Sequence, residues 1–246
     1  VLAGCDLVLT HEWESAHEAL VRAVLNGVLS ETRLRQAAGR VLTVKQLVFG
    51  ERLAMPLSID VDSAAAGVHT RDHTRVADRI AAASVTLIDG ALAPPTSRPL
   101  IIATRMARRF DPPVEAQLRA ALTAAGWEDV DVLMVDPYPD AHQAAEAAAR
   151  AQAAGWSALL HFNRVQSFDP EAVVTSDALV GLARAVSATG TPLAVVSMGS
   201  PYALPRFTEA SARLCCYSTC DASLYAAVQV LKGTTGPSGR LPVALS

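Results

Sequence analysis

The sequence lacks an excess of positive charge, a long apolar run and the pattern of a signal peptide in its first residues. Its formal net charge is −3 over 246 residues, and the charged residues are scattered. A basic face is therefore absent, and we expect no nucleic-acid partner. No apolar run approaches the roughly 18 residues that a membrane helix needs, and no basic region precedes an apolar stretch as in a signal peptide. We expect no membrane partner.

Cysteines are few and do not follow a metal-binding pattern. The four cysteines are Cys5, Cys215, Cys216 and Cys220. They have no His or Cys partners at zinc spacing. His69 and His73 could share a helix face, but a metal site would need further ligands. We expect reduced, structural cysteines in a cytoplasmic protein, with Cys5 buried in a strand, and no metal.

The phosphate-binding loops of nucleotide enzymes are also missing. The sequence has no GxxxxGK[ST] loop and no GxGxxG motif that opens a helix after a strand. The glycine-rich stretch GTTGPSG (233–239) follows an expected helix, which is the wrong context for a phosphate cradle. We therefore expect no cofactor.

From residue 71 onward, apolar runs alternate with helical patterns. Hydrophobic residues make up 51% and charged residues 18% of the chain, as in a globular protein with a substantial core. The expected strands are 84–89, 99–103, 131–135, 157–162, 192–198 and 213–217, and the expected helices are 72–83, 112–125, 139–154, 171–189 and 220–232. Continuous apolar strands between helices predict an α/β three-layer sandwich with a mostly parallel sheet of about six strands.

The first fifty residues have a different pattern. GCDLVLT (4–10) is typical of a buried parallel strand. Helical spacing follows over 14–26, and Gly27 stops that helix. Ser30 then begins a second helix that runs to about residue 48. We expect the irregular stretch 51–70 to be a linker between residues 1–50 and an α/β domain over 71–246.

Polar residues follow the ends of two expected strands of the sheet. The loops after 157–162 and 192–198 leave the same edge of a parallel sheet, where α/β enzymes place their sites. The side chains that we expect to line one crevice there are Asn163, Arg164, Ser200 and Tyr202. Arg164 could hold a carboxylate or sugar hydroxyls, or equally brace Asp169. His161 belongs to the same strand end.

His11 and Glu12 follow the expected strand 4–10 in the same way, although a solvated loop is an equal alternative. Paired carboxylates for glycoside cleavage must lie within about 10 Å of each other. Glu12, Asp136 and Asp169 are candidates by loop position alone. In SMGSPY, Ser200 follows a strand as a nucleophile would, but Pro201 favours a tight turn over a helix start.

Four motifs, in order and with suitable spacing, resemble glycoside hydrolase family 3. The motifs are AGCDLVLTHE with GVLSETRLRQAAGRVLTVKQ, HTRVADRIAAASVTLID, PLAVVSMGSPYALPRF and AAVQVLKGTTGPSGRLPVAL. The resemblance implies that residues 1–50 are the C-terminal strand and helices of a (β/α)8 barrel and that 71–246 are the family's C-terminal sandwich. The details resemble its β-N-acetylglucosaminidase branch, with the β-glucosidase and β-xylosidase branch as the rival.

The resemblance also implies what the chain lacks. The family's Asp nucleophile lies on a barrel strand before the segment that matches Val1, and in this branch the acid/base His and its Asp partner lie in an upstream barrel loop. None has a counterpart here. In the other branch the sandwich supplies a Glu, which no residue here matches. The resemblance therefore implies a retaining glycosidase as the parent protein and a catalytically inactive fragment, with His11, Glu12, Asn163, Arg164 and Tyr202 as substrate-binding candidates.

Two alternatives remain open: a non-catalytic module that binds carbohydrate or docks a barrel, and a free-standing flavodoxin-like domain. Apart from carbohydrate, the expected partners are the missing barrel portion and a second copy of the chain. A strand–helix–helix segment without its barrel should expose an apolar patch and promote association.

Overall fold

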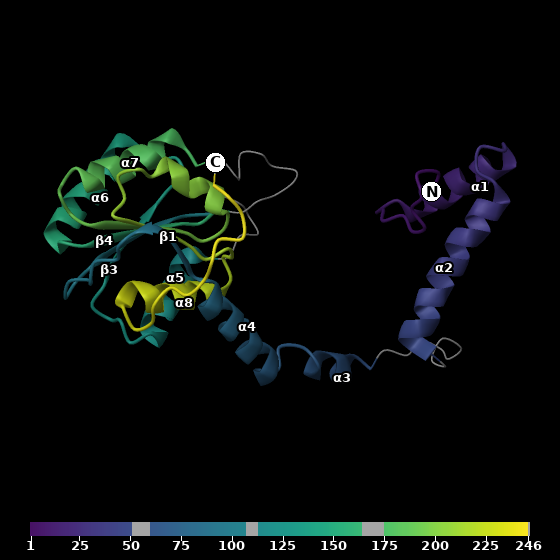
Figure 1. The fold of residues 1–246 in the computed structure, drawn as a ribbon, viewed down its shortest axis with the longest axis horizontal. Helices are drawn as coiled ribbons and strands as arrows, with labels where there is room; N and C mark the ends of the chain where they lie inside the picture. The colour runs from purple at the N-terminus through teal and green to yellow at the C-terminus, as the bar shows by residue number, and fades with distance from the viewer. Residues whose placement is uncertain (51–59, 107–112, 164–174, 246) are drawn as a thin grey trace. The chain divides into compact units, whose positions relative to one another are not determined.

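The computed structural model describes residues 1–50, 60–106, 113–163 and 175–245. The chain forms two compact units, Val1–Ala65 and Ala66–Ser246 (Figure 1). The assignment of residues 1–50 to a barrel stays a prediction.

The first unit consists of helices and an extended amino-terminal segment. Its helices are α1 (Trp13–Leu25), α2 (Glu31–Phe49) and α3 (Val61–Ala66), the last of which reaches the boundary of the second unit. Ser30 caps α2 as predicted, because its hydroxyl accepts a hydrogen bond from Arg33 N at 3.2 Å. Gly27, with φ +69°, turns the chain between α1 and α2 in the left-handed region.

The predicted strand over 4–10 is wrong, and so is the predicted burial of Cys5. This stretch is irregular, Cys5 is exposed, and Leu9 is 97% exposed. A parallel strand is formed by hydrogen bonds to its neighbours, and residues 1–50 and 60–65 contain no strand that could supply them. Instead, Asp6 ties the segment to α2 through Arg33, at 2.8 Å, and Arg40, at 3.1 Å.

The second unit is a six-stranded sheet with the strand order β1-β6-β5-β4-β2-β3. The strands are β1 (Thr86–Gly90), β2 (Leu100–Thr104), β3 (Asp131–Val135), β4 (Ser157–His161), β5 (Leu193–Ser197) and β6 (Ala212–Cys215). All neighbours are parallel except β1 and β6, which are antiparallel. The prediction of a mostly parallel sheet of about six strands is confirmed.

Helices cover both faces of this sheet, as Figure 1 shows. The helices are α4 (Arg71–Ser84), α5 (Val114–Ala124), α6 (Ala141–Ala154), α7 (Asp177–Ser187) and α8 (Asp221–Lys232). Successive side chains of a strand point to opposite faces. Accordingly, Leu160 of β4 packs in the core with α5 and α8, whereas Leu159 packs in the core with α6 and α7. Two-sided burial explains why the strands are continuous apolar runs.

His69 and His73 do not share a helix face. His69 has φ +52° and lies before the N-cap of α4, Thr70, whose hydroxyl accepts from His73 N at 3.2 Å. Only His73 is helical, because the cap fixes the helix start one residue after Thr70. For α7, the structure places the start at Asp177, and residues 171–174 of the predicted helix lie outside the described residues.

Candidate functional site

The strand order creates a topological switch point between β2 and β4. Counted along the chain, the parallel strands β3, β2, β4, β5 and β6 follow the flavodoxin-like order 2-1-3-4-5. The connections after β2 and β4 lead to helices on opposite sides of the sheet, α5 and α7, and ligands of such folds bind at the carboxyl ends of the strands at this point. Here Thr104 ends β2, and its buried hydroxyl accepts a hydrogen bond from Phe162 N at 2.8 Å.

Beside the switch point, Asn163 joins the ends of β4 and β5. Its amide nitrogen donates to Ser197 Oγ at 2.8 Å and to His161 O at 3.3 Å. Its amide oxygen accepts from Ser200 N at 2.5 Å. Ser197 Oγ in turn donates to Ser200 O at 2.7 Å. Asn163 is 4% exposed, and its side-chain polar atoms bond to the protein itself rather than to open solvent.

The turn after β5 is set by Gly199. A Cβ at this position would collide with the backbone oxygen of Asn163 and would lie 2.6 Å from its Oδ1. Only glycine permits the two loops to approach this closely. The stretch that follows is the 3₁₀ helix η3 (Pro201–Arg206), capped by Ser200, so the expectation that Pro201 prevents a helix start is wrong. Proline is compatible with the first helical position, because its missing N–H has no partner there.

His161 is a buried titratable group at this edge of the sheet. Its side chain is buried beside the ring of Phe207, at a centroid distance of 6.1 Å, and Nε2 lies 3.1 Å from Thr175 Oγ1. Burial lowers the pKa of His161 from 6.5 to about 4, because the charged imidazolium loses its hydration. Within the described part of the chain, Nδ1 has no hydrogen-bond partner.

The start of α7 is held against η3. Arg206 donates to Thr175 O and pairs with Asp177. Ser176 caps α7 by accepting from Leu179 N at 3.1 Å, and its hydroxyl donates to Pro137 O at 2.6 Å. The ends of β3, β4 and β5 are therefore connected through α7 and η3.

The structure brings together only some of the predicted site residues. Asn163 is buried after the end of β4, whereas Tyr202, on η3, is 57% exposed. His11 and Glu12 are exposed residues of the first unit. Arg164 lies outside the described residues, as does the alternative Asp169. The substrate-binding roles of His11, Glu12, Asn163, Arg164 and Tyr202 stay predictions.

The other candidate groups are placed as follows. Asp136 accepts from Gln143 Nε2 at 3.2 Å and lies 3.7 Å from Arg105. Ser200 Oγ caps η3, and no described histidine lies within hydrogen-bonding distance of it. Thr104 was missed in the sequence, although a hydroxyl that ends an apolar strand was an available signal.

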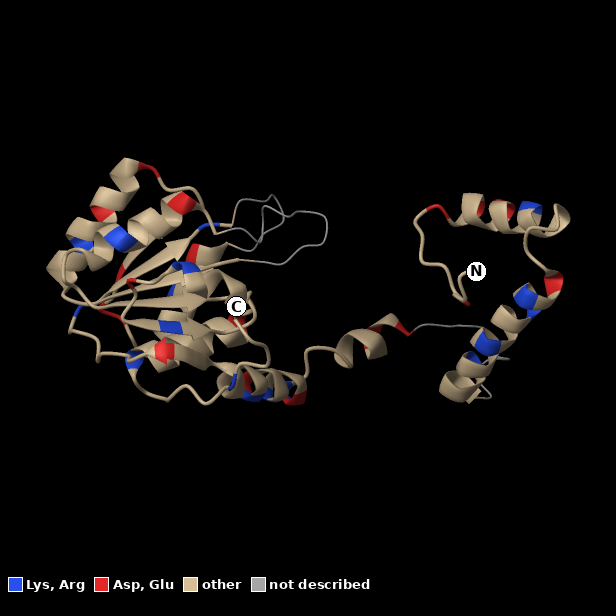
Figure 2. Cartoon of the chain, turned by 45° about the horizontal axis from the view of Figure 1, so that its top comes forward, with Lys and Arg blue, Asp and Glu red and all other residues tan. Residues whose placement is uncertain are grey.

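Basic and acidic residues are interspersed over the chain (Figure 2). Over residues 1–50, 60–106, 113–163 and 175–245, no three His, Cys, Asp or Glu side chains are grouped so that they could hold a metal ion. Over the same ranges, every helix is too short or too polar to cross a bilayer.

Comparison with known proteins gives matches among solved structures. No protein-family model and no curated protein matches the chain. A glycoside hydrolase family 3 β-N-acetylglucosaminidase from Paenibacillus is 23% identical, with a TM-score of 0.71 over 95% of this chain and 43% of its own. The β-glucoside phosphorylase BglX is 20% identical, with a TM-score of 0.70 over 97% of this chain and 43% of its own.

A β-glucosidase from Listeria innocua in complex with isofagomine is 17% identical, with a TM-score of 0.65 over 89% of this chain and 33% of its own. The chain thus spans less than half the length of each of these structures. The family resemblance in the sequence is confirmed at the level of the fold: this chain has the architecture of part of a family 3 glycoside hydrolase.

Proposed function

We propose that this chain is the C-terminal part of a retaining glycoside hydrolase that cleaves terminal β-linked sugars. The observation that carries this proposal is the match over 95% of this chain to 43% of a family 3 β-N-acetylglucosaminidase. In this reading the second unit is the sandwich that flanks a catalytic barrel, and the first unit contributes the end of that barrel. The reaction would use a carboxylate nucleophile and a glycosyl-enzyme intermediate.

The proposed substrates are β-N-acetylglucosaminides. The support is the resemblance of the sequence motifs to that branch and the similarity to the Paenibacillus enzyme. A β-glucosidase and a β-glucoside phosphorylase have similar folds. Fold alone therefore decides neither the sugar nor the acceptor, which depend on particular site residues.

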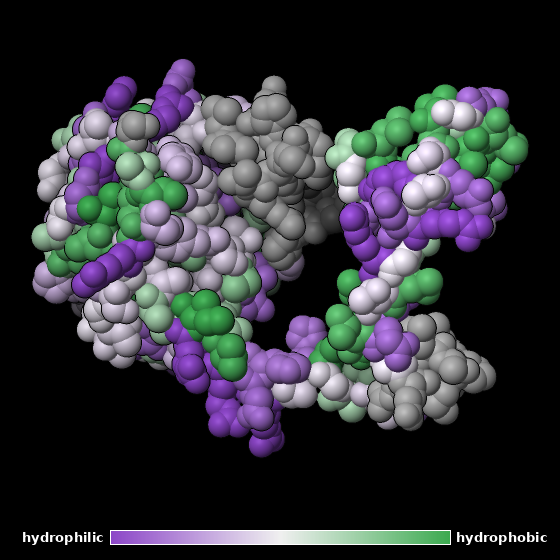
Figure 3. All heavy atoms as spheres, turned by 45° about the vertical axis from the view of Figure 1, so that its right-hand side comes forward, coloured by the Kyte–Doolittle hydropathy of each residue, from purple (hydrophilic) through white to green (hydrophobic). Residues whose placement is uncertain are grey.

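The exposed apolar surface of the first unit supports the proposal that a further segment, the rest of the barrel, packs against it. Its large exposed apolar side chains are Leu2, Leu7, Val8, Leu9, Trp13, Val21, Leu25, Val28, Leu42, Val44, Leu47, Val48, Phe49 and Val61. Figure 3 shows hydrophobic atoms gathered over this unit. It also contains a mostly apolar hollow of about 500 Å³ between the amino-terminal segment, α1 and α2, with Leu20 and Val41 in its lining. Contiguous apolar surface of this kind marks an interaction site.

The second candidate is a non-catalytic module that binds carbohydrate or docks a barrel. The barrel-docking form is favoured by the internal hydrogen bonds of Asn163, Ser197 and Ser200, because these bonds commit the three residues to holding the loops together rather than to binding a sugar. A module of this kind would bind a sugar or a barrel without turnover.

The test compares this chain with the product of its gene including any in-frame coding sequence before the Val1 codon. Both proteins are assayed with chromogenic β-N-acetylglucosaminide and β-glucoside. We expect hydrolysis only by the longer product, and faster with the N-acetylglucosaminide. Turnover by this chain alone would show that the nucleophile lies within it. A gene without a barrel segment would refute the enzyme proposal, and sugar titration monitored by NMR would then test the binding module.

A further inference from the structure

β3 is an edge strand, and no described strand pairs with its outer side. It pairs with β2 on one side, and it ends the strand order of the sheet. An edge strand presents unpaired backbone groups, which another strand can use for pairing, and native proteins often protect such edges with charged side chains.

The open backbone groups of β3 belong to two residues. Asp131 N donates to Pro99 O at 3.0 Å, and Val135 O accepts from Arg105 N at 2.8 Å. Asp131 and Val135 therefore face β2. Because alternate residues of a strand direct their backbone groups to opposite sides, Val132 and Met134 direct theirs outward.

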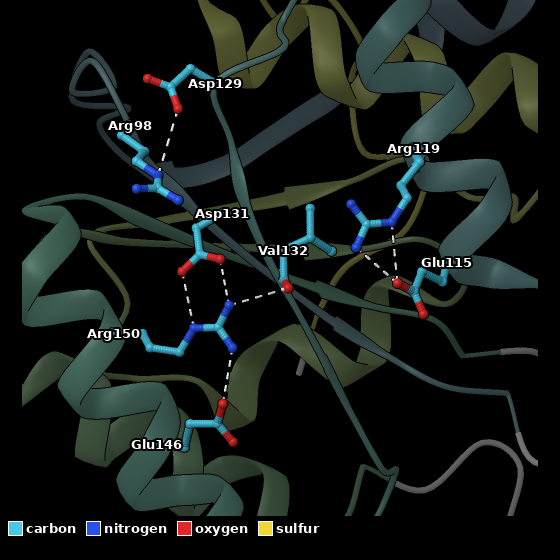
Figure 4. A network of polar contacts seen from close by, with 8 residues as sticks. All are labelled: Arg98, Glu115, Arg119, Asp129, Asp131, Val132, Glu146 and Arg150. Atoms are coloured by element: carbon cyan, nitrogen blue, oxygen red, sulfur yellow. Dashed lines mark hydrogen bonds and ion pairs between the residues drawn. The ribbon is translucent and has the colours of Figure 1, made fainter.

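An arginine covers the first outward carbonyl. Arg150 of α6 places Nη2 3.4 Å from Val132 O (Figure 4). The guanidinium is fixed by Asp131, which it binds with two nitrogens, and by Glu146, which accepts from Nη1 at 2.9 Å. Arg150 lowers the pKa of Asp131 by hydrogen bonding to its carboxylate.

A second arginine covers the other outward carbonyl. Arg105, which follows β2, donates from Nη1 to Met134 O at 2.8 Å. The same nitrogen lies 3.7 Å from Asp136 Oδ1, and Asp136 also accepts a hydrogen bond from Gln143 of α6. Each outward carbonyl of β3 therefore has its own arginine, and each arginine is held by a carboxylate at one end of the strand.

We propose that Arg105 and Arg150 close the outer edge of β3 against strand addition by a second copy of this chain. A second copy is the expected occupant because it brings an identical edge at the same concentration. An added strand would have to displace two arginine–carbonyl contacts and bring its own backbone against two fixed guanidinium groups. The two arginines thus prevent a second strand from pairing with β3. This inference does not depend on the proposed enzymatic function.

The test is the full chain with Arg105→Met and Arg150→Met together. Methionine retains much of the apolar stem but cannot donate to a carbonyl. Arg119→Met is the matched control, because it removes an exposed pair with Glu115 on α5 (Figure 4) and leaves β3 unchanged. We expect the association constant, measured by sedimentation, to rise about tenfold or more in the double variant, and to equal that of the unsubstituted chain in the control.

Two further readouts locate the contact. Hydrogen exchange at Val132 N and Met134 N should slow in the associated double variant. Adding Val132→Pro should reverse the association, because this substitution removes an outward donor without removing a hydrogen bond to β2, and proline is tolerated on an edge. Association that is unchanged in the double variant, or that survives Val132→Pro, would overturn the proposal. If the double variant does not fold, the half-exposed Arg105→Met alone must still raise association.

Discussion

Asn163 Oδ1 accepts a hydrogen bond from Ser200 N at 2.5 Å, and this contact holds the loop after β4 against the loop after β5. The amide nitrogen of Asn163 binds Ser197 as well. Asn163→Ala should leave these buried groups unsatisfied and lower the free energy of unfolding by about 1–3 kcal/mol. Denaturant titration measures the loss. Gln152→Ala, on the exposed side of α6, is the control and should change stability little.

Gly199 is expected to reject any side chain. Gly199→Ala would place Cβ against the backbone oxygen of Asn163, and we expect a loss of about 1–3 kcal/mol through overpacking. Gly181→Ala is the matched control, because nothing lies within 4 Å of a Cβ there and alanine favours the helix α7. The control should be neutral or stabilising. Equal unfolding midpoints for both variants would contradict the crowding described at Gly199.

His161 should make the sandwich sensitive to acid. Its pKa is lowered from 6.5 to about 4 in the folded state by burial, so the folded protein holds it neutral. The contribution of His161 to the free energy of unfolding is fully present above pH 6.5 and is lost as the pH falls toward 4. Its total is on the order of 3 kcal/mol. Unfolding curves between pH 7 and 4 measure this slope.

The variant His161→Leu should flatten that slope, because leucine fills the site without taking up a proton. His142→Leu is the control, since His142 is exposed on α6. It should retain the slope of the unsubstituted protein. If His161→Leu also retains it, the acid sensitivity arises from other groups.

Ser176 should contribute more to the free energy of unfolding than a helix cap alone contributes, because it makes two hydrogen bonds. Ser176→Ala removes both the cap to Leu179 N and the bond to Pro137 O, and should cost about 1–3 kcal/mol. Asp140→Ala removes the cap of α6, where the carboxylate accepts from Gln143 N at 2.8 Å, and should cost about 1 kcal/mol. Denaturant unfolding of both variants compares the two costs. A larger loss for Asp140→Ala would argue against the link to Pro137.

The apolar surface of the first unit should promote self-association of this chain. Leu9 and Trp13 are 97% and 69% exposed. Leu9→Gln with Trp13→Gln should weaken association without loss of helix content, because neither side chain belongs to a core. Light scattering after gel filtration measures the change. Tyr138→Gln, which alters a 62% exposed residue of the second unit, is the control. Undiminished association in the double variant would place the contact elsewhere.

The sequence determined the elements of the second unit. The predicted strand 131–135 is β3 with the same bounds, and helix 139–154 corresponds to α6 within two residues. These predictions succeed because burial on both faces requires continuous apolar runs. In the first unit, the cap at Ser30 was predictable because capping is a local interaction. The family resemblance was likewise carried by short motifs in order, and the fold is similar to that of a family 3 enzyme.

Only the tertiary structure decided which strands are neighbours and what their polar ends contact. The antiparallel pairing of β6 with β1 joins residues more than 120 positions apart, as in the contact of Arg213 with Asp89. The inward orientation of the Asn163 amide is fixed by the hydrogen bond from Ser200 N, and Ser200 belongs to another loop. The stretch 4–10 has the composition of a strand but forms none, because a strand is completed by its neighbours rather than by its own residues.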